Sequence, residues 1–414
     1  MNKKNTFLIL SWSMYDMANQ FFALNIVSLY FVRWITFEKG APEIFYSIAF
    51  GLSTLLIALL APILGTIADI RRRHRPFLVF FTMLSVIFTI FLAFTEDIFM
   101  ALLFFGIANI GCQTAVIFYN SLMLTISPDE RTGLVSGLGK MFGYFGAIIA
   151  LIFTKPIIIK QGYQATFFLT GSLFFLFSLP CMIFVKDKVV YKTKPALPVL
   201  INKKLIIDLF KRLRTTLFVS KQYAGLREFL KAAFFGLCVV NVTMLFMSIY
   251  VTKVFGLDDI EIINFIAFST IFAIIGSISS GIISDWIGYK KTMMGIFLCW
   301  IVCLFGAALA TPPFHWLIGA LAGISLGSTW VVSRALVVSI VPKEMTGEAF
   351  GLFNFIGYLS AAVGPIVWGL LLLGLGHLGA LGYRLALMSF IPFLIIGCIF
   401  LLRVPNIKSN YKRG

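Results

Sequence analysis

The sequence is dominated by apolar stretches that are each long enough to cross a lipid bilayer. A helix rises about 1.5 Å per residue, so roughly 20 apolar residues span the hydrocarbon core. With 60% hydrophobic and 12% charged residues, the chain carries far less charge than soluble domains, in which about a quarter of residues are charged. We therefore predict an all-α membrane protein with twelve transmembrane helices. The stretches lie near residues 7–32, 44–66, 77–95, 98–126, 134–159, 165–185, 230–252, 260–283, 292–311, 314–341, 349–375 and 380–402.

A basic segment divides the twelve stretches into two sets of six. Residues 186–221 contain ten Lys or Arg, two Asp and no Glu. We expect a six-helix bundle over residues 1–185, a cytoplasmic linker over 186–227 and a second six-helix bundle over 228–414.

Part of this linker has the pattern of an amphipathic helix. Leucines recur every fourth residue from Leu205 to Leu217, and lysines and arginines fill most of the opposite face. This pattern predicts a helix over 200–219 on the anionic cytoplasmic surface of the membrane. The alternative is a solvated linker that is merely positive.

The positions of Lys and Arg indicate the orientation in the membrane. If the spans alternate in direction, 26 of these residues fall on the side of both termini and 6 on the other. Cytoplasmic loops are enriched in Lys and Arg, so we expect both termini in the cytoplasm and a location in the cell (inner) membrane. These clusters at span ends also explain the net charge of +17, and we expect no nucleic-acid partner.

The sequence gives little reason to expect an enzyme or a cofactor. The six cysteines lie inside apolar spans without a C-x-x-C pair, which predicts neither disulfides nor a metal site. His74, His315 and His377 lie at span ends, and we assign them no ligand role. A phosphate-binding G-x-x-x-x-G-K-[S/T] loop is absent, which disfavours ATP-driven transport.

The two sets of six spans are related by an internal repeat. Seven identities at a fixed offset of 214 residues fall within seventeen positions. An even number of spans keeps both copies in one orientation, as in transporters that rock two bundles around a midplane site. The identities pair Pro128, Glu130, Thr132, Gly133, Gly137, Gly143 and Tyr144 with Pro342, Glu344, Thr346, Gly347, Gly351, Gly357 and Tyr358.

A short motif follows spans two and eight. Gly65 and Asp69 precede a run of arginines that includes Arg73, and Gly281 and Asp285 precede Lys290. The glycine permits close helix approach, and the aspartate can meet a helix N-terminus or an arginine. The motif resembles the G-x-x-x-D-x-x-G-x-K/R loop of the major facilitator superfamily. The resemblance implies a twelve-helix transporter fold, with these residues gating the change between inward- and outward-open states.

The resemblance extends over nearly the whole chain. The stretches 11–22, 119–147, 246–257, 333–344 and 383–390 are similar to the branch called the unknown major facilitator family. That branch includes a fungal autophagy-related vacuolar amino-acid effluxer. The resemblance therefore implies amino-acid transport as one function to expect.

Polar side chains within the spans are the candidate substrate-binding residues, because each is costly in lipid unless it faces a cavity. In span one they follow an i, i+3, i+4, i+7 pattern on one helical face. The resemblance implies that spans one, four, seven and ten line a central cavity and that spans five and eleven complete it. The candidates are Trp12, Tyr15, Asp16, Asn19, Asn109, Gln113, Asn120, Lys140, Tyr144, Asn241, Trp330, Arg334, Asn354 and Tyr358.

Three charged residues lie at similar depth. Asp16, Lys140 and Arg334 each lie about 9–14 Å from the cytoplasmic end of their helices. Asp16 is the only acidic residue deep within a span, and we assign it the coupling of transport to protons. Alternatively, the two cations extend to the inner headgroups and Asp16 forms a structural ion pair with one of them.

The sequence therefore favours a monomeric secondary transporter that works by alternating access. Its substrate would be a small polar or zwitterionic molecule such as an amino acid, since two cations and one carboxylate complement such a solute. One alternative is an exporter of amphiphilic or lipid-like compounds. Another is a membrane receptor or assembly platform without transport activity, although the long polar domain typical of such proteins is absent.

Overall fold

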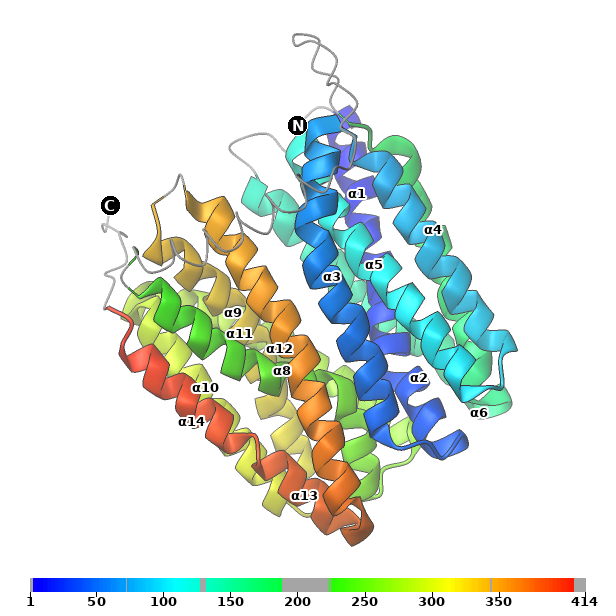
Figure 1. Cartoon of the computed structure of the whole chain (residues 1–414), viewed down its shortest axis with the longest axis vertical. Helices are drawn as coiled ribbons and strands as arrows, with labels where there is room; N and C mark the ends of the chain where they lie inside the picture. The colour runs from blue at the N-terminus through cyan, green and yellow to red at the C-terminus, as the bar shows by residue number, and fades with distance from the viewer. Residues whose placement is uncertain are drawn as a thin grey trace. The chain divides into compact units, whose positions relative to one another are not determined.

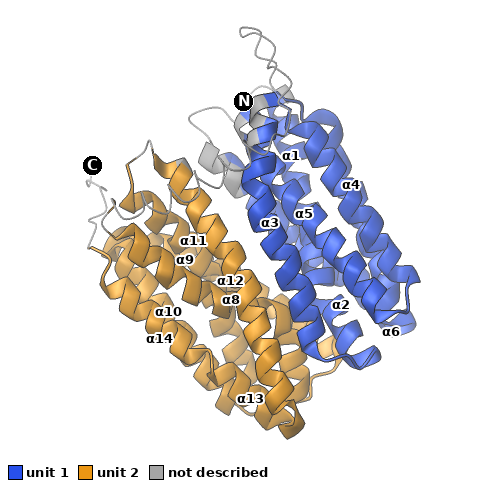
Figure 2. Ribbon diagram, viewed as in Figure 1, with its two compact units in different colours: residues 1–209 blue, residues 210–414 orange. Residues whose placement is uncertain are grey.

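The computed structural model describes residues 3–71, 73–126, 132–187, 223, 225–342 and 345–405, in which all regular structure is helical (Figure 1). The chain forms two compact units, residues 1–209 (unit 1) and 210–414 (unit 2) (Figure 2). The amphipathic helix expected over 200–219 lies outside the described residues, and the linker boundaries stay predictions.

Unit 1 contains one long broken helix followed by four further helical segments. Residues 72 and 127–131 interrupt the description at two of its loops. The helices are α1 (Lys3–Phe21), η1 (Phe22–Leu29), α2 (Tyr30–Arg33), η2 (Trp34–Glu38), α3 (Glu43–Arg71), α4 (Arg75–Phe91), η3 (Leu92–Phe94), α5 (Ile98–Ile126) and α6 (Thr132–Phe184).

Unit 2 has the same succession of long apolar helices. Its last span is interrupted at Ser389–Phe390. The helices are α8 (Leu226–Phe255), α9 (Asp259–Ile287), α10 (Tyr289–Leu309), α11 (His315–Ile340), α12 (Thr346–Leu375), η6 (Gly376–Leu378), α13 (Ala380–Met388) and α14 (Ile391–Leu402).

Within the described residues, eleven helical segments are long and apolar enough to cross a membrane. One of them, Leu138–Phe184, has 47 residues, about twice the length that one crossing needs. It is broken at Gly162, whose φ of 79° and ψ of −175° are not helical. Gly162 thus separates spans five and six, as expected from the sequence, and the chain is an all-helical protein of eleven to twelve spans.

The two units use corresponding helix pairs. In unit 1, α1 packs on α6, and α5 packs on both α3 and α4. In unit 2, α8 packs on α12, and α11 packs on both α9 and α10. The pairs correspond in chain order, in agreement with the internal repeat.

Small residues permit the closest helix contacts, as expected where lipid removes much of the hydrophobic drive for association. A Cβ added at Gly276 would lie 2.5 Å from the carbonyl oxygen of Ile324. Across the same interface, a Cβ at Gly323 or Gly327 would overlap the backbone of α9 at Ser269 or Ala273. Gly323 and Gly327 therefore allow α11 to pack directly on the backbone of α9.

Span one departs from α-helical geometry in its C-terminal half. Phe22–Leu29 and Trp34–Glu38 are π-helical. At the end of the first of these, the amide of Tyr30 donates to the carbonyl of Asn25, five residues earlier. Asn25 is buried and donates from Nδ2 to Thr170 Oγ1 over 3.0 Å, so this part of the helix is tied to α6.

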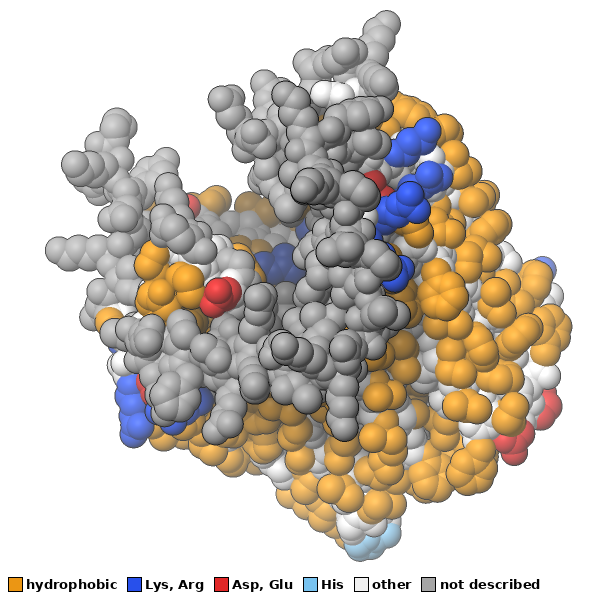
Figure 3. Space-filling model, turned by 45° about the horizontal axis from the view of Figure 1, so that its top comes forward, with side chains coloured by type: hydrophobic (Ala, Val, Ile, Leu, Met, Phe, Trp, Pro, Cys, Tyr) orange, Lys and Arg blue, Asp and Glu red, His pale blue; other side chains and the backbone are white. Residues whose placement is uncertain are grey.

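Burial distinguishes interior from peripheral spans. In their most apolar windows, spans one and seven are each 67% buried, whereas α3, α4 and α9 are 33%, 33% and 28% buried. Hydrophobic side chains cover much of the visible surface of the described residues (Figure 3). Such a surface fits a hydrocarbon environment, in which apolar side chains need no cover.

Candidate functional site

Asp16 and Lys140 form an ion pair between α1 and α6. The Nζ atom of Lys140 lies 3.4 Å from Asp16 Oδ1. The Asp16 side chain is 7% exposed and that of Lys140 is 53% exposed. The carboxylate is therefore inside unit 1, and the ammonium reaches it from a more exposed position.

Aromatic rings from two helices pack beside this pair. Trp12 stacks on Tyr119 with 4.4 Å between ring centroids and 8° between planes, and its Nε1–H donates to the Tyr119 carbonyl over 3.0 Å. Tyr15 also stacks on Tyr119, at 4.8 Å, and its hydroxyl lies 2.7 Å from Thr82 Oγ1. Three rings of α1 and α5 are thereby fixed around the segment that carries Asp16.

Glycines on α6 leave room for the Asp16 carboxylate. A Cβ added at Gly139 would lie 2.8 Å from Trp12 Cζ3 and 3.0 Å from Asp16 Oδ2. Two turns along, a Cβ at Gly146 would lie 2.7 Å from the carbonyl oxygen of Met17. The chain therefore brings α6 close to α1 at the level of the ion pair, which places Lys140 within reach of Asp16.

The polar residues predicted on span four occupy different environments. Asn109 is fully buried and donates from Nδ2 to Ser53 Oγ over 2.8 Å, which joins α5 to α3. Asn19 of span one accepts from Cys112 Sγ at 2.8 Å. Gln113 is half-buried and Asn120 is exposed. Asn109 thus makes a contact within the bundle, whereas Gln113 and Asn120 keep accessible surface.

The remaining candidates are mostly more accessible. Tyr144 on α6 is half-buried. In unit 2, Asn241 donates from Nδ2 to the Leu237 carbonyl over 2.7 Å and to Ser360 Oγ over 3.4 Å, which joins α8 to α12. Trp330 and Tyr358 are half-buried, and Arg334 and Asn354 are exposed. The structure joins Asp16 to Lys140 within unit 1, and Arg334 belongs to unit 2.

The repeated loop motifs show specific contacts in unit 2. Asp285 accepts a hydrogen bond from the Tyr289 hydroxyl over 3.2 Å. Lys290 donates from Nζ to the carbonyls of Leu402 and Val404, over 2.9 and 2.5 Å. Lys290 therefore binds the carboxyl end of α14, where a helix exposes unpaired carbonyls and favours a cation.

In unit 1, the same motif has an exposed Arg73, and the side chain of Asp69 lies outside the described part. A Cβ added at Gly65 would meet no atom of the described residues within 4 Å, and at Gly281 it would lie 3.8 Å from Val331 Cγ1. The close helix approach that we expected from these two glycines is therefore not made by Gly65 within unit 1.

Comparison with known proteins identifies the family. The family model of the major facilitator superfamily matches residues 16–365 and 288–414. The chain belongs to the major facilitator superfamily. It is 28% identical to an uncharacterized MFS-type transporter, YxiO, of Bacillus subtilis, over 97% of this chain and 95% of that protein. It is 22% identical to a homologue of the multi-drug resistance efflux pump PmrA of Lactococcus lactis, over 89% and 87%.

Solved structures show the same superfamily fold. A bacterial homologue of the human lysosomal transporter Spinster, in an inward-facing and unoccupied conformation, superposes with a TM-score of 0.74 at 14% identity over 97% of both chains. As a member of the major facilitator superfamily, this protein is an integral multi-pass secondary transporter that works by alternating access, and it is not an enzyme.

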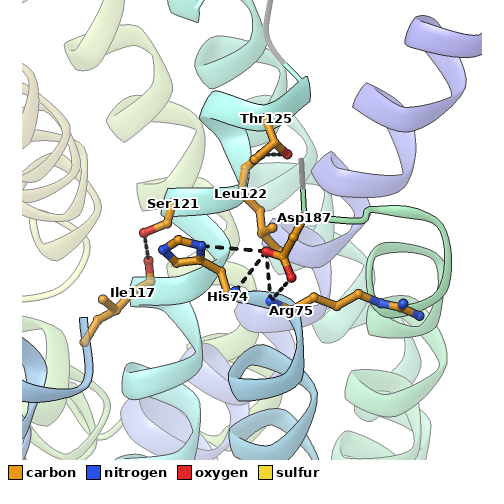
Figure 4. A network of polar contacts seen from close by, with 7 residues as sticks. All are labelled: His74, Arg75, Ile117, Ser121, Leu122, Thr125 and Asp187. Carbon is orange, nitrogen blue, oxygen red and sulfur yellow. Dashed lines mark hydrogen bonds and ion pairs between the residues drawn. The ribbon is translucent and has the colours of Figure 1, made fainter. Parts of the chain in front are cut away.

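In this superfamily member, a polar network that the sequence did not indicate joins the ends of α4 and α6 (Figure 4). The Asp187 carboxylate accepts from the amides of His74 and Arg75, over 2.8 and 3.3 Å, and lies 3.7 Å from His74 Nδ1. Arg75 donates from Nε to the Met182 carbonyl over 2.6 Å. Asp187 thereby caps the amino end of α4, and Arg75 binds the carboxyl end of α6.

Tyr119 also belongs to the candidate site, although the sequence did not single it out. Its ring is buried and stacks on both Trp12 and Tyr15, which lie on α1 shortly before Asp16 in the sequence. The resembling stretch 119–147 contains both Tyr119 and Lys140. A signal for Tyr119 was thus present in the sequence, but an aromatic residue in an apolar span reads as core.

Proposed function

We propose that this transporter moves a small zwitterionic solute of the amino-acid class and couples its movement to protons. The observation that carries the proposal is the unequal exposure of the Asp16–Lys140 pair, 7% against 53%. A solute carboxylate can approach the exposed ammonium of Lys140 and compete with Asp16. A buried carboxylate that loses its cation is costly, so Asp16 then binds a proton. Solute binding and proton binding are coupled through one lysine.

The remaining candidate residues complete the proposed site, and Trp12 and Tyr15 among them are buried. In unit 1 we assign solute contacts to Trp12, Tyr15, Asn19, Gln113, Asn120 and Tyr144. In unit 2 we assign Arg334 to the solute carboxylate, with Trp330, Asn354, Tyr358 and Asn241 as further contacts. The likeness to the unknown major facilitator family supports amino acids as the class. We further propose a monomer in the cell membrane with both termini in the cytoplasm, which the Lys and Arg positions support.

A second function is favoured by one comparison. The relative from Lactococcus lactis carries the name of a multi-drug efflux pump homologue. Export of an amphiphilic compound is accordingly the alternative.

A transport panel separates the two proposals. The full chain in proteoliposomes is offered labelled amino acids, short peptides, organic anions and an amphiphilic cationic dye, with and without a pH gradient. We expect at least one zwitterion to accumulate only when the gradient is imposed. Transport of the dye alone, with no zwitterion transported, would favour export of amphiphilic compounds as the function.

We propose that the repeated loops gate the transition between conformations. Asp69→Asn is expected to change the ratio of inward- to outward-open states by about tenfold. This factor corresponds to the free energy of one charge-assisted hydrogen bond. Asp285→Asn should have a smaller effect, because Asp285 already accepts a hydrogen bond from Tyr289 one turn away. Spin-label distances between the units measure the ratio. Unchanged populations in a folded Asp69→Asn protein would rule out this role for Asp69.

A further inference from the structure

Unit 2 contains a recess that is separate from the candidate solute site. It has a volume of about 320 Å³ and lies between α8 and α12. Its walls include Arg227, Lys231, Phe234 and Phe235 of α8. Ile356 and Leu359 of α12 form the other side. The recess is thus charged at one end and apolar elsewhere.

The charged end has an excess of positive charge. Arg227 is exposed and has no hydrogen bond or ion pair with any described residue. Lys231 Nζ lies 3.0 Å from Glu228 Oε1 and 4.8 Å from the ring centroid of Phe400. The guanidinium of Arg403 lies 5.8 Å from the same ring. Arg227 and Lys231 therefore line the recess, and Arg403 adds a third cation beside Phe400. With Glu228 as the one carboxylate paired here in the described part of the chain, the local charge fits an anion.

The apolar end continues from the cations along the helices. At about 1.5 Å per residue, Phe235 lies about 6 Å further along α8 than Lys231. Its ring stacks on Phe400 of α14 at 6.1 Å and meets Phe393 edge-on at 5.7 Å. The walls therefore change from cationic to hydrocarbon over one or two helical turns. A free phosphate would occupy only the charged end and leave the apolar end unfilled. An amphiphile with an anionic head group fills both ends of the recess.

We propose that this recess binds one anionic phospholipid. Its phosphate lies against Arg227 at the charged end, with Arg403 as a further cation beside Phe400, and an acyl chain packs on Phe234, Ile356 and Leu359. Arg227 lies at the N-terminal end of α8, and the distribution of Lys and Arg along the chain assigns this end to the cytoplasm. The lipid therefore comes from the cytoplasmic leaflet. Each cation near an anionic leaflet contributes to the free energy of lipid binding. The apolar wall adds selectivity for a lipid acyl chain.

Lipid binding to the purified full chain tests the charged end. Native mass spectrometry of the delipidated protein measures the affinity for phosphatidylglycerol and phosphatidylcholine of equal chain length. We expect Arg227→Gln to weaken phosphatidylglycerol binding about fivefold, and Arg227→Gln/Arg403→Gln about 25-fold, with little change for phosphatidylcholine. Lys291→Gln is the matched control, since it removes an exposed cation of α10 outside the recess. Equal losses in Lys291→Gln and Arg227→Gln would overturn the proposal.

A second variant tests the apolar end without changing charge. Leu359→Trp places a larger side chain in the recess, and we expect it to weaken phosphatidylglycerol binding about tenfold in a protein of unchanged melting temperature. Glycerol phosphate and inorganic phosphate should fail to compete with the lipid at equal concentration. If either competes fully, the site binds an anion and not a lipid.

Photocrosslinking identifies the occupant directly. A benzophenone amino acid at Leu359, in the full chain in phosphatidylglycerol vesicles, is expected to label the lipid acyl chain. A crosslink to residues 188–222 of the same chain in place of lipid would show that the linker occupies the recess and would refute lipid binding there.

Discussion

We expect Asp16→Asn to abolish uptake driven by a pH gradient and to preserve exchange of substrate at equal concentrations. The amide has nearly the same size as the carboxylate, so it fits beside Gly139, where an added Cβ would lie only 3.0 Å from Asp16 Oδ2. It mimics the protonated acid and cannot release a proton, so the coupled step stops while the conformational cycle continues. Uptake and exchange in proteoliposomes measure the two activities separately.

The control for this variant is an acid outside the membrane spans. Glu96 is an exposed carboxylate that pairs with Lys39, and the hydrogen bond from Lys39 lowers the pKa of Glu96. Glu96→Gln should retain coupled uptake at the level of the unmodified protein.

A structural ion pair predicts a different pattern. If Asp16 only offsets the charge of Lys140, then Asp16→Asn lowers thermal stability, and Asp16→Asn/Lys140→Gln restores both stability and gradient-driven uptake. The loss should stay below the roughly 3–5 kcal/mol typical of breaking a fully buried pair, since Lys140 is half exposed. Full coupled transport in the double variant would refute the coupling role.

We expect Arg334→Ala to weaken substrate binding by about 10- to 150-fold, because losing a hydrogen bond to a charged group costs about 1.5–3 kcal/mol. Arg334→Lys should restore binding only in part, because an ammonium cannot make the planar two-pronged contact of a guanidinium with a carboxylate. Binding of the transported solute to purified protein, measured by calorimetry, gives the affinities. Lys291→Ala is the control, because it removes an exposed cation that is not part of the proposed solute site.

Two results would contradict this role of Arg334. Unchanged affinity in Arg334→Ala would remove Arg334 from the solute site. Complete recovery in Arg334→Lys would show that charge alone matters and that the guanidinium has no specific geometry to recognise.

The spans and their breaks could be predicted from the sequence because the bilayer imposes a length on each apolar stretch. Gly162 illustrates this: a glycine between two apolar stretches of full length indicates a turn, and its φ of 79° confirms it. The partner of Asp16 could not be predicted. Sequence gives depth along a helix, and Lys140 and Arg334 have similar depth. Only the packing of α1 on α6, which Gly139 and Gly146 permit, brings Lys140 to Asp16.

The capping of helix ends by residues distant in the sequence could not be predicted either. Arg75 and Lys290 are basic residues at span ends, and the positive-inside pattern alone accounts for such residues. In the structure, each binds carbonyls at the end of the last span of its own unit. More than a hundred residues separate the partners, and no local periodicity records such contacts. Asn109 is similar, because its partner Ser53 lies on another helix.

The π-helical geometry of span one affects how sequences of this family should be aligned. A π turn holds one more residue than an α turn, so the helical face that carries Trp12 and Asn19 does not continue in phase beyond Phe22. A relative with one residue fewer between Phe22 and Leu29 can form an ordinary α turn and still present the same inner face. Alignment gaps in span one therefore belong in this segment, and an ungapped alignment across it would pair side chains that point in different directions.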